Sequence, residues 1–496
     1  MAGRTSKPTV GSLPDATTGS SYVPVVLTWL VWSIFVASVV VLVARIRLGT
    51  SLEVTGVIGV DGLTVLLWVV VAFFSGIVHS YSRRYMAGSR HETAFFLSVF
   101  GFTVIVMGLA AADHLALFAV LWLAMGLVMA ELIGTVDGWK QARAAASVAR
   151  TYFLASSALL AVALTTLWWA TGEATISGIA AVAAVSGLDG PVWLVAAVAL
   201  VIAAMIQSAL VPFHGWLLSS MTTPTPASAL MHAGFVNAGG ILLTRFAPVV
   251  TVDATLMLGI VAVGATSALL GKLLKAVQTD VKGELGCSTV GQMGFMIMQA
   301  GLGFFGAAIT HLVLHGFYKA YHFLSAGERI EHASPIHEAS SEAGVAGLVT
   351  VLLTGLAGGA LFAALTGKGT SVDSGLLLAL FVVLTTLHAA RSVVERASLP
   401  GPARYGAVPL VFLPAITVYA LVYEAISGVL SGLPVVSAPT ELGAVHALVA
   451  VVFVAVYVAM EADLHERSPR LYVALLNASQ PAPSTVLTAT EEYDEY

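Results

Sequence analysis

Residues 310–327 read THLVLHGFYKAYHFLSAG, an apolar segment that carries four titratable side chains. His311, His315, Lys319 and His322 follow one another at spacings of four, four and three residues. At about 100° per residue, these spacings place all four on one narrow stripe of a helix, and at about 1.5 Å per residue the stripe covers about 16 Å of the axis. The segment is therefore predicted to be a helix with one polar line on an apolar surface.

The segments on either side of this helix are apolar as well. The chain has 496 residues, of which 58% are hydrophobic and only 10% are charged. A soluble protein of this size needs far more charge on its surface. Apolar runs of about 20 residues, long enough to cross a hydrocarbon core of about 30 Å, recur between residues 24 and 461. The sequence thus predicts an all-α, polytopic transmembrane helix bundle.

Fourteen membrane spans are predicted from these runs. They cover residues 24–46, 58–79, 93–112, 114–134, 149–171, 191–211, 226–250, 253–277, 284–303, 306–326, 344–366, 374–394, 406–431 and 440–462. The weaker apolar segment 174–185 is too short to cross and is expected at an interface. We expect three regions: a polar N-terminal tail at 1–23, a transmembrane domain at 24–462 and a C-terminal tail at 463–496, which ends in EEYDEY.

The distribution of positive charge predicts the orientation. Seventeen of the 22 Lys and Arg residues fall on one side of the alternating spans, four fall on the other, and Lys319 lies inside a span. The positive-inside rule then places both termini in the cytoplasm. Residues 1–23 lack a short apolar core followed by a cleavage site, so we expect no cleaved signal peptide.

The chain has a single cysteine, Cys287. It excludes an intrachain disulfide and any cysteine-built zinc or iron–sulfur site within this sequence. We expect no cofactor or metal in this chain, no catalytic residue of its own, and no nucleic-acid partner. Redox cofactors, if the activity needs them, belong to another protein.

The stripe of His311, His315, Lys319 and His322 is costly inside a membrane, at roughly 2.5–3.5 kcal/mol for a charged side chain at the centre of a span. Imidazole titrates near neutral pH, so we interpret the four residues as a proton relay. In the alternative interpretation each histidine bonds a neighbouring carbonyl group and Lys319 extends to an interface.

A second segment, IQSALVPFHGWLLSSMTTPTPASALMHAGFVNAGG, predicts a broken helix near residues 207–226. Pro212, Pro224 and Pro226 interrupt the helical hydrogen bonds, and broken helices at membrane depth border cavities and transport sites. The next helix carries His232, a relay candidate, and Asn237, a possible ion ligand. An ordinary loop between helices is equally compatible with this composition.

Three more residues are possible members of an ion path. Lys272 and Lys275 precede the charged turn QTDVKGE, and a cytoplasmic loop with two extended lysines explains this pattern on physical grounds alone. Glu131 lies near the end of the fourth span, from where it can reach water or a basic residue.

Five motifs follow one another between residues 60 and 327: VDGLTVLLWVV, HSYSRRYM, PTPASALMHAG, VQTDVKGELGCSTVGQMGFM and HLVLHGFYKAYHFLSAG. Together they resemble the antiporter-like family, which comprises the large membrane subunits of respiratory complex I (subunit 5 or L type) and Mrp-type cation/proton antiporters. The resemblance implies that His232, His311, His315 and Lys319 take part in intramembrane proton transfer, and that the broken helix holds a central site.

The sequence also departs from the family pattern. Leu123 follows Trp122 where the family has a glutamate, and Gln207 stands where the family has a lysine. The loss of the glutamate and the lysine together leaves no unpaired buried charge, whereas removing only one partner of a buried pair costs about 3–5 kcal/mol. Glu131 is an imperfect substitute for the glutamate, and the usual charged loop after the histidine helix is absent. His388 is a candidate to replace a later family lysine, although a structural role suits it as well.

The chain ends soon after Glu461, without room for the long lateral helix of complex I subunits. The short C-terminal region and the residues of the motifs resemble the DabB branch, also called MpsA, the membrane subunit of two-component inorganic-carbon transporters. The resemblance implies a DabA-like partner that holds zinc, and transport of protons or sodium ions across the bacterial inner membrane. Two other hypotheses stay open: a subunit of an NADH–quinone oxidoreductase-like complex or Mrp-type antiporter, and a membrane scaffold that does not conduct.

Overall fold

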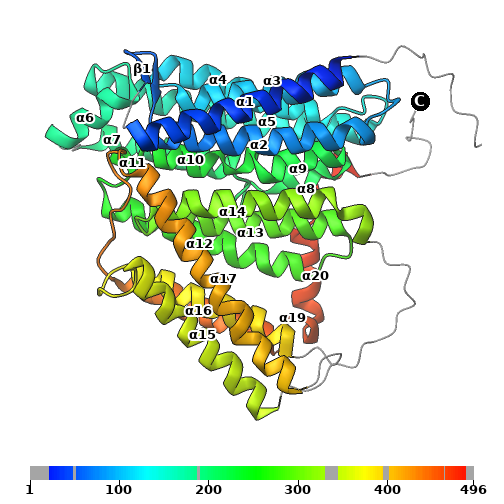
Figure 1. Ribbon diagram of the computed structural model, residues 1–496, viewed down its shortest axis with the longest axis vertical. Coiled ribbons are helices and arrows are strands. Elements are labelled where there is room, and N and C mark those ends of the chain that lie inside the picture. The colour runs from blue at the N-terminus through cyan, green and yellow to red at the C-terminus, as the bar shows by residue number, and fades with distance from the viewer. Residues whose placement is uncertain are drawn as a thin grey trace, which may run out of the picture.

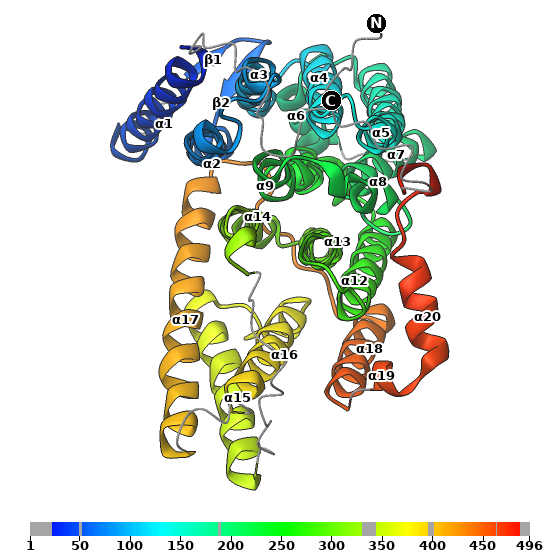
Figure 2. The same cartoon turned by 90° about the vertical axis from the view of Figure 1, so that its right-hand side faces the viewer.

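The computed structural model describes residues 22–48, 52–186, 190–329, 344–394, 401–462 and 464–486. Helices dominate it (Figures 1 and 2). The predicted N-terminal tail, the segment 330–343 and the acidic end of the chain fall largely outside these residues. The all-α prediction is confirmed, with one exception. A hairpin of β1 (Leu52–Val54) and β2 (Ile58–Val60) precedes the second span.

The first half of the chain forms a layer of long helices. In chain order these are α1 (Val23–Leu48), α2 (Gly62–Tyr85), α3 (Glu92–Ala111), α4 (Leu115–Ile133), α5 (Lys140–Thr171), the short α6 (Ile176–Ser186) and α7 (Pro191–Gln207). Asp61 caps α2, because its side chain accepts a hydrogen bond from the backbone N–H of Thr64. The guanidinium group of Arg245, far along the chain, pairs with Asp61 and donates to the Ala110 carbonyl at 2.6 Å.

The predicted broken helix is present, and it contains more breaks than expected. After α7 come α8 (Gly215–Ser219), η1 (Ser220–Thr222), α9 (Thr225–Ala233), η2 (Phe235–Asn237), α10 (Ala238–Arg245) and α11 (Ala247–Val250). The hydropathy of residues 226–250 predicts one continuous span, whereas the backbone breaks again at Gly234. There the N–H of Asn237 bonds back to the Gly234 carbonyl in a 3-10 turn.

The next three helices form the middle of the molecule. They are α12 (Ala254–Ala276), α13 (Val281–Gly301) and α14 (Phe305–Leu324), and Figure 2 shows them between the N-terminal layer and the C-terminal helices. Helices α12 and α13 meet through glycines. A Cβ atom on Gly271 would lie 2.2 Å from the Gly291 nitrogen, and one on Gly294 would lie 2.5 Å from the Ala268 nitrogen. Small residues permit this backbone approach, as they do between other membrane helices.

The last part of the chain adds a second group of helices. These are α15 (Val345–Thr366), α16 (Gly375–Val394), α17 (Gly401–Leu430), α18 (Ala444–Glu461) and the short α19 (Leu464–Arg467). Helix α20 (Pro469–Ala478) then returns to the central helices, where it packs against α12 (Figure 1), and the turn η4 (Pro483–Thr485) packs against α5. Leu475 of α20 is buried against Leu218 and Leu274. The region predicted to be a C-terminal tail therefore includes a packed helix.

Ten helices in the described part of the chain are long and apolar enough to cross a membrane, if α9, η2 and α10 (Thr225–Arg245) are counted as one interrupted span. The other four predicted spans are helical but differ in length or polarity. Helix α7 and the apolar part of α16 have 17 residues each, while α13 and α14 carry more polar side chains. The chain is a multi-pass membrane protein.

Candidate proton relay

Helix α14 carries the predicted stripe, and its burial increases toward the middle of the molecule. Lys319 is completely buried and His315 is 5% exposed, while His311 and His322 are half-buried. The rings of His311 and His315 lie with their centroids 5.8 Å apart and nearly parallel. Four titratable residues thus follow one helix from its half-buried parts into the interior.

Lys319 has a specific partner on the neighbouring helix. Its Nζ donates a hydrogen bond of 2.7 Å to the backbone carbonyl of Leu285 in α13. The hydroxyl group of Thr289, one turn further along α13, donates to the same carbonyl oxygen at 2.9 Å. This carbonyl group therefore holds a lysine and a threonine side by side in the interior.

The same threonine reaches the broken helix. His232 Nδ1 lies 2.9 Å from Thr289 Oγ1, and the His232 ring stacks on Phe323 of α14 with centroids 4.4 Å apart. His232 is 1% exposed. Lys319, the Leu285 carbonyl, Thr289 and His232 form a continuous chain of hydrogen-bonding groups over α14, α13 and α9. We call these four groups the central cluster.

His315 has capacity for further hydrogen bonds. Neither of its ring nitrogens has a hydrogen-bond partner within the described part of the chain. Buried polar atoms are nearly always hydrogen-bonded, to protein or to ordered water, so both ring nitrogens of His315 have capacity for a water molecule. His322 lies at the other end of the stripe, against the rings of Tyr318 and Tyr321.

The two positions at which the resemblance implies an ion pair in other members, Leu123 and Gln207, are uncharged in this chain. Gln207 is fully buried at the end of α7, and neither atom of its amide group has a hydrogen-bond partner among the described residues. Leu123 is half-buried on α4. The indole N–H of its neighbour Trp122 donates to Ser156, which donates in turn to the Ala203 carbonyl. Hydroxyl and amide groups replace ionic ones here, so no charge is stranded.

Asn237 belongs to the second break of the helix. It is 1% exposed, and its amide nitrogen donates to the Ala233 carbonyl at 2.7 Å. Glu131 is exposed on α4 and is not one of the groups that meet at the Leu285 carbonyl.

A second cluster joins three helices near their C-terminal ends. Lys272 Nζ of α12 lies 2.8 Å from His388 Nε2 of α16, and His388 Nδ1 lies 2.9 Å from Glu461 of α18. Arg391 also pairs with Glu461. Lys275, one turn from Lys272, forms an ion pair of 3.0 Å with Glu284 of α13. The structure therefore connects three of the predicted ion-path residues to carboxylates.

Two participants were missed by sequence reasoning. Thr289 lies in the quoted motif VQTDVKGELGCSTVGQMGFM, but threonines in apolar helices usually bond only their own backbone, so its type gave no signal. Glu461 was treated only as the end of a span. An acidic residue at the end of an apolar span could have been paired with a basic residue at the end of another span, such as Arg391. A group of three or more His, Cys, Asp or Glu side chains suited to a metal is absent from the residues that the structure describes.

Comparison with known proteins identifies the family. The family described as NADH:quinone oxidoreductase/Mrp antiporter, TM matches residues 112–367, and the N-terminal region of complex I chain 5 matches residues 47–96. The chain belongs to the NADH:quinone oxidoreductase/Mrp antiporter family. The match to this family includes α9, α13 and α14, and so the whole central cluster.

Individual relatives carry two kinds of name. The probable inorganic carbon transporter subunit DabB1 of Halothiobacillus neapolitanus is 39% identical over 58% of this chain and 52% of its own length. The probable DabB subunit of Bacillus subtilis is 36% identical over 64% of this chain and 63% of its own. NADH-ubiquinone oxidoreductase chain 5 of Cryptococcus neoformans is 34% identical over 54% of this chain and 40% of its own length. This chain thus spans about half to two-thirds of the length of the DabB relatives that it matches.

The Mrp complex from Dietzia sp. has the same fold. A chain of that structure matches 93% of this chain with a TM-score of 0.53, at 20% sequence identity and over 54% of its own length. The two chains thus share the helical arrangement in which the central cluster lies.

Proposed function

We propose that this chain is the membrane subunit of an energy-coupled inorganic-carbon transporter, and that it conducts the protons or sodium ions that drive uptake of CO2 or bicarbonate. The observation that carries the proposal is the central cluster, where Lys319, Thr289 and His232 meet through hydrogen bonds of 2.7–2.9 Å. The names of the DabB relatives support the choice of inorganic carbon as the substrate class.

Protons enter the cluster along the stripe of α14. The parallel rings of His311 and His315 lead toward Lys319, one turn further along the helix. Thr289 donates its one hydroxyl proton to the Leu285 carbonyl in this structure. Once the hydroxyl group turns toward His232 Nδ1, it can give that proton to the imidazole and accept a replacement from Lys319, since a hydroxyl group both donates and accepts. His322 extends the stripe beyond Lys319. On the other side, Lys272, His388 and Glu461 form a line of titratable groups toward the ends of α16 and α18.

The chain works with a partner in this proposal. The DabB relatives are named as subunits, and the partner is a DabA-like protein that holds zinc and performs the carbon chemistry. The excess of Lys and Arg on one side of the spans supports insertion in the bacterial inner membrane with both termini in the cytoplasm. Replacement of the family ion pair by Leu123 and Gln207 fits a conducting subunit whose coupling chemistry lies in its partner.

Growth in air tests the proposal. This chain and its partner are expressed in a bacterial strain that lacks carbonic anhydrase and requires high CO2. The pair should restore growth in air, Lys319→Met should abolish the rescue, and the matched control Lys140→Met, at the exposed start of α5, should retain it. If the intact pair reaches the membrane without restoring growth, or if Lys319→Met rescues as well as the unaltered chain, the proposal is wrong.

The second candidate is a subunit of an NADH–quinone oxidoreductase-like complex or of an Mrp-type antiporter. The similarity to chain 5 and the Mrp fold favour it. Purification from native membranes distinguishes it from the first, because flavin or iron–sulfur subunits would accompany a redox complex. An antiporter would be revealed by sodium sensitivity of a deletion strain. A scaffold that does not conduct would tolerate apolar residues at His311, His315 and Lys319.

A further inference from the structure

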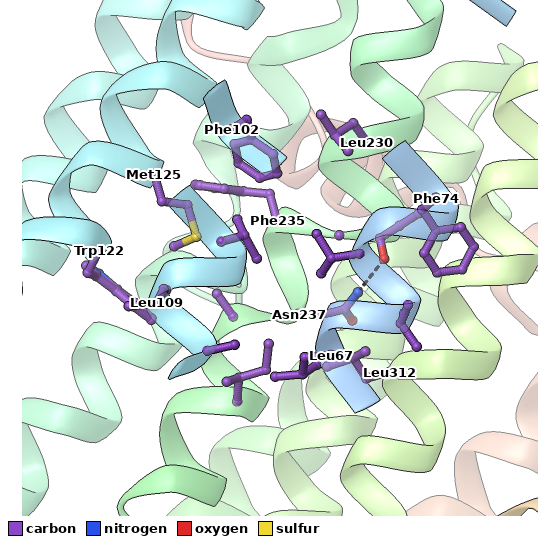
Figure 3. A pocket seen from close by; sticks show the side chains of 18 residues that line it. Leu67, Phe74, Phe102, Leu109, Trp122, Met125, Leu230, Phe235, Asn237 and Leu312 are labelled. Carbon is purple, nitrogen blue, oxygen red and sulfur yellow. Dashed lines mark hydrogen bonds between the residues drawn. The ribbon is translucent and has the colours of Figure 1, made fainter. Parts of the chain in front are cut away.

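A cavity of about 50 Å³ lies at the second break of the helix (Figure 3). Helices α2, α3 and α4 form one wall, and η2, α10 and Leu312 of α14 contribute to the other. Ala233 and Leu312 line it, and they directly follow His232 and His311 in the chain. The cavity therefore lies next to the relay residues without including them.

The lining is almost entirely apolar. Of the eighteen residues that line it (Figure 3), Asn237 and Trp122 alone have a nitrogen or oxygen atom in the side chain. The Trp122 indole nitrogen already donates to Ser156. A space of about 10–15 Å³ is enough for one water molecule, but that water also needs two to four polar partners. The cavity has the volume for water and too few partners to retain it.

Asn237 supplies one unused acceptor. Its amide nitrogen is occupied by the Ala233 carbonyl (dashed line in Figure 3), while its Oδ1, in a side chain that is 1% exposed, has no hydrogen-bond partner within the described residues. A buried amide oxygen in apolar surroundings attracts an electron-poor atom, such as the carbon of a carbonyl-like group. The occupant should therefore be small, uncharged and apolar overall, with an electron-poor centre.

We propose that this cavity binds CO2 that enters from the bilayer. CO2 has three heavy atoms, dissolves in hydrocarbon and has an electron-poor carbon atom. Val71 of α2 and Val106 of α3, which line the cavity, are half-buried, so the path to lipid passes between these two helices. The inference rests on the proposed function for its choice of gas, and it adds a substrate site within the membrane subunit itself.

Binding is measured on the purified full-length chain with two probes. Xenon under pressure reports apolar space, as in other apolar protein cavities, and is located by structure determination. Infrared spectroscopy with ¹³CO2 reports the gas itself, as a narrow absorption band distinct from CO2 in water and in detergent. Val106→Phe fills the cavity and should remove both signals. Val104→Phe, on the exposed face of the same helix (47% exposed), is the matched control and should retain them.

Asn237→Leu tests the acceptor separately. Leucine has nearly the same size, so xenon should still bind, while the ¹³CO2 band should shift to its position in hydrocarbon. The inference is overturned if xenon does not enter the unaltered protein, if ordered water or a lipid chain fills the space, or if the ¹³CO2 band is the same in Val106→Phe. Because no step depends on growth or on a partner, a failed rescue in air with retained binding would reject only the proposed function.

Discussion

Lys319, Thr289 and His232 come from three helices, and their meeting depends on one backbone carbonyl group. The Leu285 oxygen accepts from both Lys319 and Thr289, so it fixes the lysine beside the hydroxyl group that reaches His232. Burial of all three side chains keeps bulk water away from this contact. A proton transfer between them then depends on hydrogen bonds within the protein, which are stronger in such surroundings than in water.

Thr289→Val tests this dependence. Valine has nearly the same shape but no hydroxyl group, so His232 loses its link to the Leu285 carbonyl while packing is retained. We expect proton transport in proteoliposomes to fall at least roughly tenfold, within the range of positioned proton-transfer groups. Thr310→Val is the control, since Thr310 is equally buried but bonds only the Gly306 carbonyl of its own helix. Equal transport by the two variants would contradict the role of Thr289.

The Asp61–Arg245 pair gives a prediction on stability and pH. Burial raises the pKa of the Asp61 carboxyl group, but the charge of Arg245 and the hydrogen bonds from Arg245 and Thr64 outweigh it, so the pKa lies below its usual value. A lowered pKa stabilises the folded state above the unfolded-state pKa, and this contribution is lost as the pH falls through the folded-state pKa.

Asp61→Asn should therefore lower the melting temperature at pH 7. We expect the free energy of unfolding to fall by about 1–3 kcal/mol, which is less than the cost of about 3–5 kcal/mol for breaking a fully buried pair, because the Asp61 side chain is still 29% exposed. The difference from the unaltered protein should shrink as the pH is lowered toward 3, which thermal unfolding in detergent can follow. Asp253→Asn is the control, since Asp253 also caps a helix and asparagine caps equally well. A difference that is constant with pH would show that the ion pair does not stabilise the fold.

At the scale of elements, the contact between α12 and α13 positions the central cluster. Glycines bring the two backbones together at Gly271, Gly291 and Gly294, and α13 carries both Leu285 and Thr289. Without a hydrophobic driving force between helices in lipid, close packing of small residues supplies much of the association. A displacement of α13 moves the carbonyl group on which Lys319 depends.

Gly271→Leu tests this packing. Its Cβ atom alone would lie 2.2 Å from the Gly291 nitrogen, so the helices must separate, at a cost near or above the upper end of the usual 1–3 kcal/mol for overpacking. We expect a lower melting temperature and loss of proton transport. Gly259→Leu on the same helix meets no atom within 4 Å, so it should leave both unchanged. If the two variants behave alike, the close approach is unimportant.

At the scale of the whole molecule, charged groups add to the apolar contacts that attach the C-terminal helices to the middle of the protein. Glu461 of α18 contacts both His388 and Arg391 of α16, and His388 contacts Lys272 of α12. The Glu461 side chain is 15% exposed, whereas its partners His388 and Arg391 are 50% and 39% exposed, so the carboxylate lies on the inner side of this cluster. The C-terminal helices can move relative to α12 only if these contacts rearrange.

Glu461→Gln removes the charge but keeps the size. We expect proton transport to decrease. If the carboxylate also passes protons, the decrease is larger at low external buffer capacity. We also expect faster proteolysis of the loops around α16. Glu441→Gln, an exposed carboxylate shortly before α18, is the control. Unchanged transport together with unchanged proteolysis in Glu461→Gln would mean that the second cluster has neither role.

The sequence by itself determined the membrane class, most helices and the stripe on α14, because hydropathy and a spacing of three to four residues are local properties. It also indicated the break after Gln207, since proline acts on its own backbone. The second break at Gly234 has no proline, so residues 226–250 read as one span.

Only the tertiary structure decided which residues join the two clusters of the proposed relay. Thr289 joins the first because α13 brings it to His232, 57 residues earlier in the chain, and Glu461 joins the second because it contacts His388 and Arg391 of α16. The same holds for the cavity at Asn237, which is formed by helices that are distant in sequence. These contacts depend on how helices pack, and packing between distant segments leaves no regular pattern in the sequence of either one.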